Sequence, residues 1–253
     1  MTDDELARPR LRRALSHAAL AGLTPLIPVP FLDDRVLAWV REGMVRSLAA
    51  DHGLPLSDAA VQLLSGARDP GASKGLFTTL VLWPIKKLFR KFFFFLSVKE
   101  CGDLASSTLY EGYLLQHAAL SGRLAPVLAG GPDGEAEARR IRGAIVTACK
   151  AGDTGAVEQL VRRGFDGSSV LLGEASRRLA PVARKLLPRS NPTPTPAAQT
   201  TLTVEGTEAL APLVDRLLDA VWEQRGGLTA LQARFDDALA LPALPSVPRA
   251  QEP

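Results

Sequence analysis

The sequence predicts an all-α protein, a multi-helix bundle with a linker-connected C-terminal helical hairpin. Apolar residues recur at helical spacing along almost the whole chain, and no series of alternating apolar and polar residues indicates strands. The chain has 253 residues, of which 46% are hydrophobic and 23% charged, as in ordinary globular proteins. A chain of this length can bury a full core.

Composition divides the chain into four parts. Residues 189–203 are rich in proline and threonine, and such a sequence forms a flexible linker that cannot pack a core. We therefore predict a helical core domain over residues 1–188 and a C-terminal helical hairpin over residues 204–241. The hairpin must bury its apolar stripes against the main domain or a partner. Residues 242–253 form a proline-rich tail that we expect to be disordered.

The first elements follow from start and stop signals. A helix over residues 5–22 ends at glycine and is followed by three prolines in residues 23–32, which favour an extended connector. Asp33 and Asp34 suit the first turn of the next helix, because carboxylates stabilise the positive end of its dipole. That helix closes around residues 52–53. Ser57 is the expected N-cap of a short helix that ends at residue 64.

Residues 66–75 form a glycine-rich loop. A phosphate-binding loop needs lysine directly after its second glycine. Here Ala72 and Ser73 come before Lys74, so we interpret the segment as a turn and not as a nucleotide site.

Further helices are expected from apolar spacing, with breaks at glycine-rich turns. The glycine-rich loop at residues 130–134 is expected to break the chain, and Pro181 is a candidate kink. The expected helices span residues 99–120, 135–151, 155–161, 169–187, 204–225 and 228–239.

The basic aromatic segment, residues 83–96, combines four cations with a run of aromatic residues. Residues 74–99 carry a net charge of +6 with no acidic residue, whereas the whole chain carries +3, so the rest carries −3. Because the positive charge is local, we expect a local anionic partner and not a nucleic acid.

Pro84 suits the first turn of a helix that runs to about Val98. This helix would span about 22 Å, shorter than a bilayer core of about 30 Å. Its cations would occupy one sector and most of its large apolar residues the opposite sector, as in an interfacial helix. The predicted membrane or partner contact residues are Trp83, Lys86, Lys87, Arg90, Lys91, Phe92, Phe93, Phe94 and Phe95. The alternative is a core helix with solvated lysines.

No motif indicates catalysis, and we predict a protein that is not an enzyme and has no cofactor. The three histidines, His17, His52 and His117, lie in different segments without metal-ligand spacing, and no serine lies in a nucleophile motif. An enzyme whose site unites distant residues such as Asp103, Glu111 and His117 remains an alternative. A helical protein that binds a lipid-like ligand in an apolar pocket is another.

The cellular location follows from cysteines and the N-terminus. Cys101 and Cys149 lie far apart without a CxxC spacing, which is typical of reduced, buried cysteines. The N-terminus begins with acidic residues where a secretory signal would be basic. We expect a cytoplasmic protein, either free or peripheral to the inner membrane, that acts at a membrane or in an assembly.

Residues 18–54 resemble the helical YcjF-like family of bacterial proteins of unknown function. The likeness is carried by the connector Leu26-Ile-Pro-Val-Pro-Phe-Leu-Asp-Asp34, by the helix with residues 40–48, and by His52-Gly-Leu54. The resemblance implies a bacterial protein that is associated with the inner membrane and with GTPase domains as partners. It implies no catalytic residues. This chain departs from the family because it contains no GTPase domain of its own and no clear pair of transmembrane helices.

Overall fold

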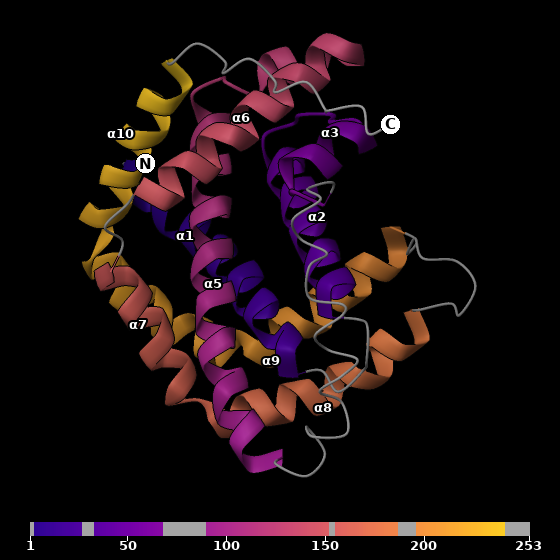
Figure 1. Cartoon of the computed structure of the whole chain (residues 1–253), viewed down its shortest axis with the longest axis vertical. Coiled ribbons are helices and arrows are strands. Elements are labelled where there is room, and N and C mark those ends of the chain that lie inside the picture. Colours follow the sequence, from indigo (N-terminus) through magenta and orange to yellow (C-terminus); the bar gives the residue numbers. More distant parts are fainter. Residues whose placement is uncertain (1–2, 27–32, 68–89, 152–154, 187–195, 241–253) are drawn as a thin grey trace, which may run out of the picture.

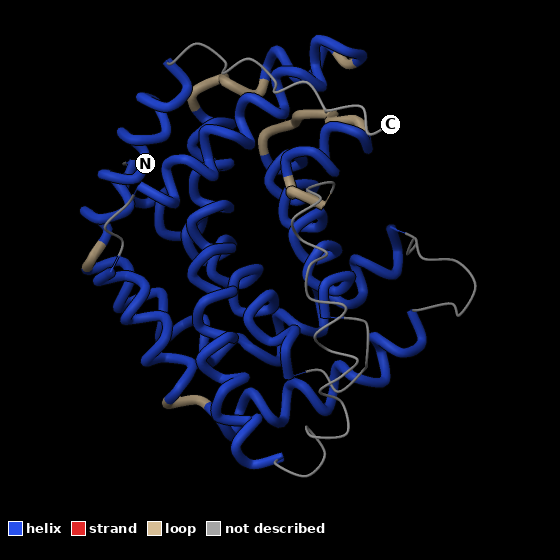
Figure 2. Tube along the Cα trace, viewed as in Figure 1, coloured by secondary structure: helices blue, strands red, loops and turns tan. Residues whose placement is uncertain are grey.

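The computed structural model describes residues 3–26, 33–67, 90–151, 155–186 and 196–240. Within these ranges the chain forms helices joined by turns, with no strand (Figure 2). The predicted all-α fold is confirmed. The predicted disordered tail, residues 242–253, and residues 189–195 of the predicted linker lie outside these ranges.

The helices up to the middle of the chain follow the predicted order. Ser57 caps the third helix as predicted, because its hydroxyl oxygen accepts the backbone N–H of Ala60 at 3.2 Å. The elements are α1 (Asp3–Leu23), the 3₁₀ turn η1 (Thr24–Leu26), α2 (Asp33–Asp51), α3 (Asp58–Leu64) and α5 (Arg90–Leu120).

In the second half of the chain, the described residues again form helices joined by turns. The elements are the 3₁₀ turn η2 (Ala125–Ala129), α6 (Gly131–Ala151), α7 (Gly155–Asp166), α8 (Ser169–Leu186), α9 (Pro196–Glu223) and α10 (Arg225–Ala240).

Helix α1 lies at the centre of the bundle. Every residue from Ala14 to Thr24 is buried, because α1 packs against α5 and α9 and also contacts α2. Most of these residues are alanine or leucine, with Gly22 near the C-terminal end. A helix that is buried all round needs no polar stripe.

Two ion pairs and one glycine show that α1 and α9 are antiparallel. Arg8 pairs with Asp219, and Arg12 lies 3.0 Å from Asp215, so the partner number falls by four as the α1 number rises by four. Two turns further along, Leu20 lies where a side chain on Gly206 would stand. Exposed pairs of this kind contribute about 0–1 kcal/mol. They therefore mark the register, and the apolar contact supplies most of the stability.

Helix α5 is the longest element and runs through the middle of the bundle (Figure 1). Its 31 residues span about 46 Å, and it contacts α1, α7, α2, α10 and α6. The predicted break between residues 98 and 99 is wrong, because one helix continues across it. No glycine or proline stands at that point, and only the change in composition suggested a boundary.

Two other breaks also differ from the prediction. Helix α6 begins at Gly131, inside the loop expected at residues 130–134. Pro132 is compatible with this start, since the first turn of a helix needs no backbone donor from it. The pair Gly226-Gly227 lies in the first turn of α10, and the break between the two helices falls at Gln224. Helix α7 runs to Asp166, five residues beyond its predicted end.

The C-terminal helices belong to the main core. Helix α9 begins at Pro196, so residues 196–203 of the predicted linker are helical. Helix α9 packs mainly on α1, α8 and α7, whereas α10 packs mainly on α6 and α5. The stripes of both helices join the same hydrophobic cluster as α1 and α5. The expected burial of these stripes against the main domain is thus observed.

Gly22→Ala is expected to destabilise the fold. A methyl group on Gly22 would lie 2.6 Å from the carbonyl oxygen of Cys101 and 2.7 Å from the Phe165 ring. Overpacking of this kind costs about 1–3 kcal/mol, which exceeds the gain in helix propensity of about 1 kcal/mol or less. Urea unfolding measures the change.

Gly143→Ala is the matched control, because Gly143 is helical and exposed and a methyl group there meets nothing within 4 Å. This variant is expected to gain about 0.5–1 kcal/mol. Equal effects of the two substitutions would contradict the close packing of α1 on α5.

Candidate functional site

The predicted contact residues fall at the start of α5. Trp83, Lys86 and Lys87 lie outside the described residues. Arg90, Lys91 and the four phenylalanines Phe92, Phe93, Phe94 and Phe95 lie in the first turns of α5, but the structure describes only their backbone. The structure therefore joins these six residues on one helix end and leaves the contacts of their side chains untested.

Helix α5 enters the core directly after the contact residues. Lys99 and Glu100 are exposed, and Cys101 is fully buried. Asp103, one turn into the bundle, lies 2.7 Å from Arg162 of α7. In Figure 1 this end of α5 lies at the lower edge of the molecule.

A buried ion cluster joins α2, α5 and α6. Glu111 of α5 lies 3.0 Å from Arg142 of α6 and 3.4 Å from Arg41 of α2. The carboxylate and the Arg142 side chain are each only 11% exposed. Arg41 also donates a long hydrogen bond of 3.4 Å to the Ser107 hydroxyl. Two guanidinium groups on one carboxylate hold the three helices in a fixed arrangement.

Cys149 stands beside this cluster, and its thiol has a raised pKa. Burial, and then the negative charge of Glu111, raises the pKa of the Cys149 thiol to about 12. Burial likewise raises the pKa of Cys101 to about 12. Both cysteines are free. A thiol with such a pKa is a poor nucleophile and a poor metal ligand at neutral pH.

His117 of α5 pairs with Asp236 of α10. Its Nε2 lies 3.0 Å from a carboxylate oxygen of Asp236, and its ring packs edge-on against Phe235. A hydrolytic site would need a nucleophile on this pair. The nearby hydroxyl of Ser121 instead donates to the carbonyl oxygen of His117 at 2.8 Å. The pair therefore links two helices.

The three candidate catalytic residues do not meet. Asp103, Glu111 and His117 lie on one helix, but each contacts a different neighbour. Asp103 contacts α7, Glu111 contacts α2 and α6, and His117 contacts α10. Among the described residues, no group of three or more His, Cys, Asp or Glu side chains could hold a metal ion. None of the described helices is long and apolar enough to cross a bilayer.

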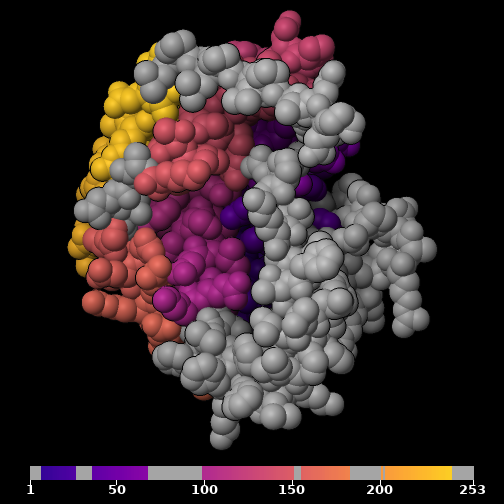
Figure 3. Space-filling model, in the orientation of Figure 1, coloured from indigo at the N-terminus to yellow at the C-terminus, as the bar shows by residue number. Residues whose placement is uncertain are grey.

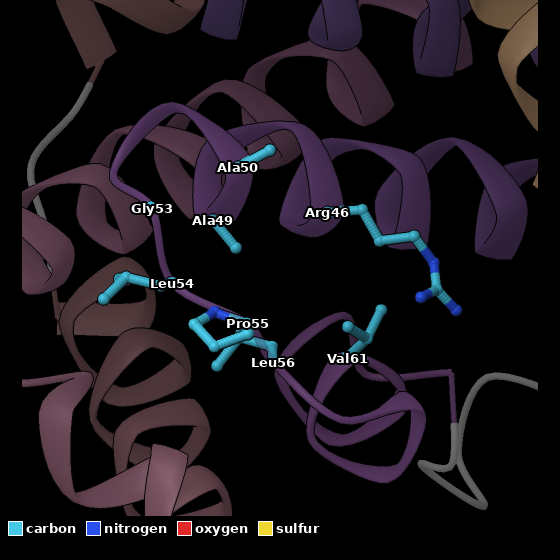
Figure 4. A pocket seen from close by; sticks show the side chains of 8 residues that line it. All are labelled: Arg46, Ala49, Ala50, Gly53, Leu54, Pro55, Leu56 and Val61. Atoms are coloured by element: carbon cyan, nitrogen blue, oxygen red, sulfur yellow. The ribbon is translucent and has the colours of Figure 1, made fainter.

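An apolar groove lies between the end of α2 and α3, and we call it the α2–α3 groove. Its volume is about 490 Å³ and it is open to solvent. Figure 4 shows Ala49 and Val61 on its two walls and Arg46 at one end. Arg46 lies 2.8 Å from Asp58. The full lining is Arg46, Ala49, Ala50, Gly53, Leu54, Pro55, Leu56 and Val61.

A second cavity of about 520 Å³ lies where α1, α5, α9 and α10 meet, and we call it the Trp222 groove. Trp222 and Tyr113 supply two half-buried aromatic rings. The Arg225 guanidinium lies 4.9 Å from the Trp222 ring centre. Burial raises the pKa of Tyr113, which keeps its hydroxyl protonated as a donor. Glu223 and Thr229 line the exposed side.

His17 is a buried histidine inside α1. It is 5% exposed, and one ring nitrogen, Nδ1, lies 3.1 Å from the Arg13 carbonyl oxygen, to which it donates. The other ring nitrogen is buried without a hydrogen-bond partner. Burial lowers the pKa of His17 from its ordinary value of 6.5, and the backbone bond opposes this shift only in part. The ring is therefore neutral at neutral pH.

Both grooves were missed by the sequence analysis. Each is lined by residues from helices that are distant in sequence or separated by a turn, and helical periodicity does not say which helices are neighbours. The segment Leu54-Pro55-Leu56 was a usable signal, because an apolar connector next to proline stays extended and cannot fill the space between its helices.

Comparison with known proteins adds no relative. No protein-family model matches the chain, and searches of curated proteins and of solved structures found no significant match.

Glu111→Gln is expected to lower the free energy of unfolding by about 3–5 kcal/mol, since it leaves two buried guanidinium groups without their carboxylate. Asp219→Asn, which breaks the exposed pair with Arg8, should cost about 0–1 kcal/mol. Urea unfolding of both variants measures the difference. A cost below 1 kcal/mol for Glu111→Gln would contradict the structural role of the cluster.

The buried His17 predicts that stability falls in mild acid. Its pKa is near 6.5 in the unfolded chain and lower in the folded one, so the unfolded chain takes up the proton first. Stability is complete above pH 6.5 and declines as pH falls below it, by at most about 1.4 kcal/mol per pH unit. His17→Leu should flatten this slope in urea titrations between pH 7.5 and 5. An unchanged slope would assign the acid sensitivity to other groups.

Proposed function

We propose that the chain is a non-enzymatic protein that binds an anionic membrane surface peripherally through the basic aromatic segment. The observation that carries this proposal is the confinement of charge: residues 74–99 hold a net +6, and the rest of the chain holds −3. A surface of anionic lipid attracts such a cluster by about 1 kcal/mol per cation.

The position of the segment supports this function. Its last residues form the start of α5, and α5 is fixed in the core from Cys101 onward by contacts with five helices. A force on the helix end is therefore transmitted to the whole bundle. Such an arrangement suits a protein that holds an assembly at a surface.

The polar groups support a non-catalytic role. Asp103 and Glu111 form ion pairs that join helices, and His117 joins α5 to α10 through its contact with Asp236. Both cysteine thiols have a raised pKa. These groups are used to fix the arrangement of helices. A protein partner, such as the GTPase that the family resemblance implies, is the alternative to lipid at the same segment.

A second candidate function is the binding of a lipid-like ligand, and the α2–α3 groove favours it. The groove has a volume within the range of small-molecule sites, about 300–1,000 Å³, and its walls are apolar. Arg46 at one end would meet an anionic headgroup. A single acyl chain is the ligand of matching chemistry.

Co-sedimentation with anionic liposomes tests the membrane function. We expect the wild type to bind, and the quadruple variant Lys86/Lys87/Arg90/Lys91→Glu to lose at least about tenfold in affinity, because attraction becomes repulsion at four positions. Binding should weaken at high salt. Equal sedimentation of the wild type and this variant would contradict the proposal.

Two further variants separate charge and groove effects. Lys150/Arg163/Arg177/Arg178→Glu changes the net charge equally at four exposed positions outside the segment, and it should keep most of the binding. Leu56→Glu places a charge in the α2–α3 groove. If only Leu56→Glu abolishes lipid binding, the second candidate function replaces the first.

A further inference from the structure

The Trp222 groove carries one charged side chain of each sign at its opening. Arg225, in the first turn of α10, and Glu223, in the last turn of α9, both line the groove and are exposed. They do not pair with each other, and neither forms an ion pair with another described residue. Two opposite charges that are held apart in one groove are complementary to a ligand that carries both charges.

Arg225 is held in a fixed orientation by Trp222. Its guanidinium carbon lies 4.9 Å from the Trp222 ring centre, and its Nη1 donates to the Trp222 carbonyl oxygen at 3.1 Å. Stacking uses the face of the guanidinium, so the donors Nε and Nη2 remain at its edge. A carboxylate can accept from both, which is the strong bidentate arrangement of arginine. The contact with Trp222 therefore orients Arg225 as a carboxylate-binding group.

Two neutral donors line the same groove. They are the Tyr113 hydroxyl of α5 and the indole N–H of Trp222, and neither has a hydrogen-bond partner among the described residues. Both side chains are half-buried. A donor that is partly shielded from water gains free energy when a ligand supplies an acceptor. With Arg225, these donors can satisfy the oxygens of one carboxylate.

The inner wall of the groove is apolar. It consists of Ala7 and Leu11, one turn apart on α1, and Leu228 of α10. Leu11 and Leu228 are 3% and 1% exposed, so this wall is the outer side of the core. The volume of about 520 Å³ lies within the range of small-molecule sites, about 300–1,000 Å³. Helix α10 lies at the left edge of the molecule in Figure 3.

We propose that the Trp222 groove binds a free α-amino acid with a large apolar side chain. The carboxylate pairs with Arg225, and the ammonium group faces Glu223. The apolar side chain packs on Leu11 and Leu228. A ligand with a single charge would leave one of the two charged residues without a partner, whereas an α-amino acid carries both charges on one carbon atom. This site shares no residue with the basic aromatic segment or the α2–α3 groove.

Fluorine NMR of the full chain labelled with 5-fluorotryptophan tests this binding. The chain has three tryptophans, and Trp222→Phe assigns the resonance of Trp222. Titration with L-phenylalanine should shift the Trp222 resonance in a saturable manner. The resonance of Trp39, which is buried in the core, should stay in place as the internal control. The absence of a saturable shift up to about 10 mM phenylalanine would overturn the proposal.

Three analogues test the class of ligand. Phenylalaninamide lacks the carboxylate and glycine lacks the side chain, so each should bind at least about tenfold more weakly than phenylalanine. N-acetylphenylalanine lacks the ammonium group and should bind about two- to fivefold more weakly, as expected for loss of an exposed ion pair. Equal affinity for N-acetylphenylalanine would assign the groove to the C-terminal residue of a peptide, and equal affinity for phenylalaninamide to an N-terminal residue. Either result would overturn a free amino acid as the ligand, and equal affinity for glycine would overturn the role of the apolar wall.

Arg225→Gln tests the carboxylate contact. This variant should lose about tenfold in affinity for phenylalanine, because a charge-assisted contact is removed. Its affinity for phenylalaninamide should equal that of the wild type, since that ligand makes no such contact. Equal losses for both ligands would overturn the assignment of the carboxylate to Arg225.

Gly226→Leu tests the location of the site. Gly226 lines the groove, and a Cβ atom there meets nothing within 4 Å. The new side chain should therefore fill the groove without disturbing the fold, and it should abolish the phenylalanine-induced shift. Gly143→Leu is the matched control, because Gly143 is also helical and open, and it should bind as the wild type does. Binding by Gly226→Leu with wild-type affinity would overturn this site.

Discussion

The close packing of α1 among α5, α9 and α2 is the constraint on which the other contacts depend. Ala14 to Thr24 are buried on every side, so the neighbouring helices must approach a surface of small residues. Gly22 lies against the backbone of Cys101, and Leu20 fills the space left by Gly206. These contacts join the first helix to helices about 80 and 190 residues later in the chain.

Polar side-chain contacts fix the outer helices on this centre. Glu111 with Arg41 and Arg142, His117 with Asp236, and Asp103 with Arg162 connect successive levels of α5 to different neighbours. Of these contacts, only the Glu111–Arg142 pair is buried, and a buried pair adds specificity of arrangement more than net stability. Helix α5 therefore acts as a frame that carries its first turns, and with them the basic aromatic residues, at one end of the bundle.

Helical periodicity was sufficient to predict the fold class and most elements, because apolar spacing is a local property. Ser57 marked the start of α3, and the three prolines marked the end of the first helical region. Composition alone misled at residues 98–99 and at residues 196–203, where no stop signal is present and the helix continues. Glycine pairs misled at α6 and α10, since a helix tolerates glycine in its first turn. The two grooves, and the packing of α9 and α10 on different helices, depend on tertiary contacts. The spacing of apolar residues does not encode such contacts.

Native-state hydrogen exchange tests most directly whether α1 joins the C-terminal helices α9 and α10 to the rest of the bundle in one cooperative unit. Amides in residues 14–23 of α1, 105–118 of α5 and 210–221 of α9 should exchange with the same free energy as global unfolding, because each segment is buried against the others. Exchange of α9 and α10 by a separate opening of lower free energy, with α1 and α5 still protected, would contradict this account.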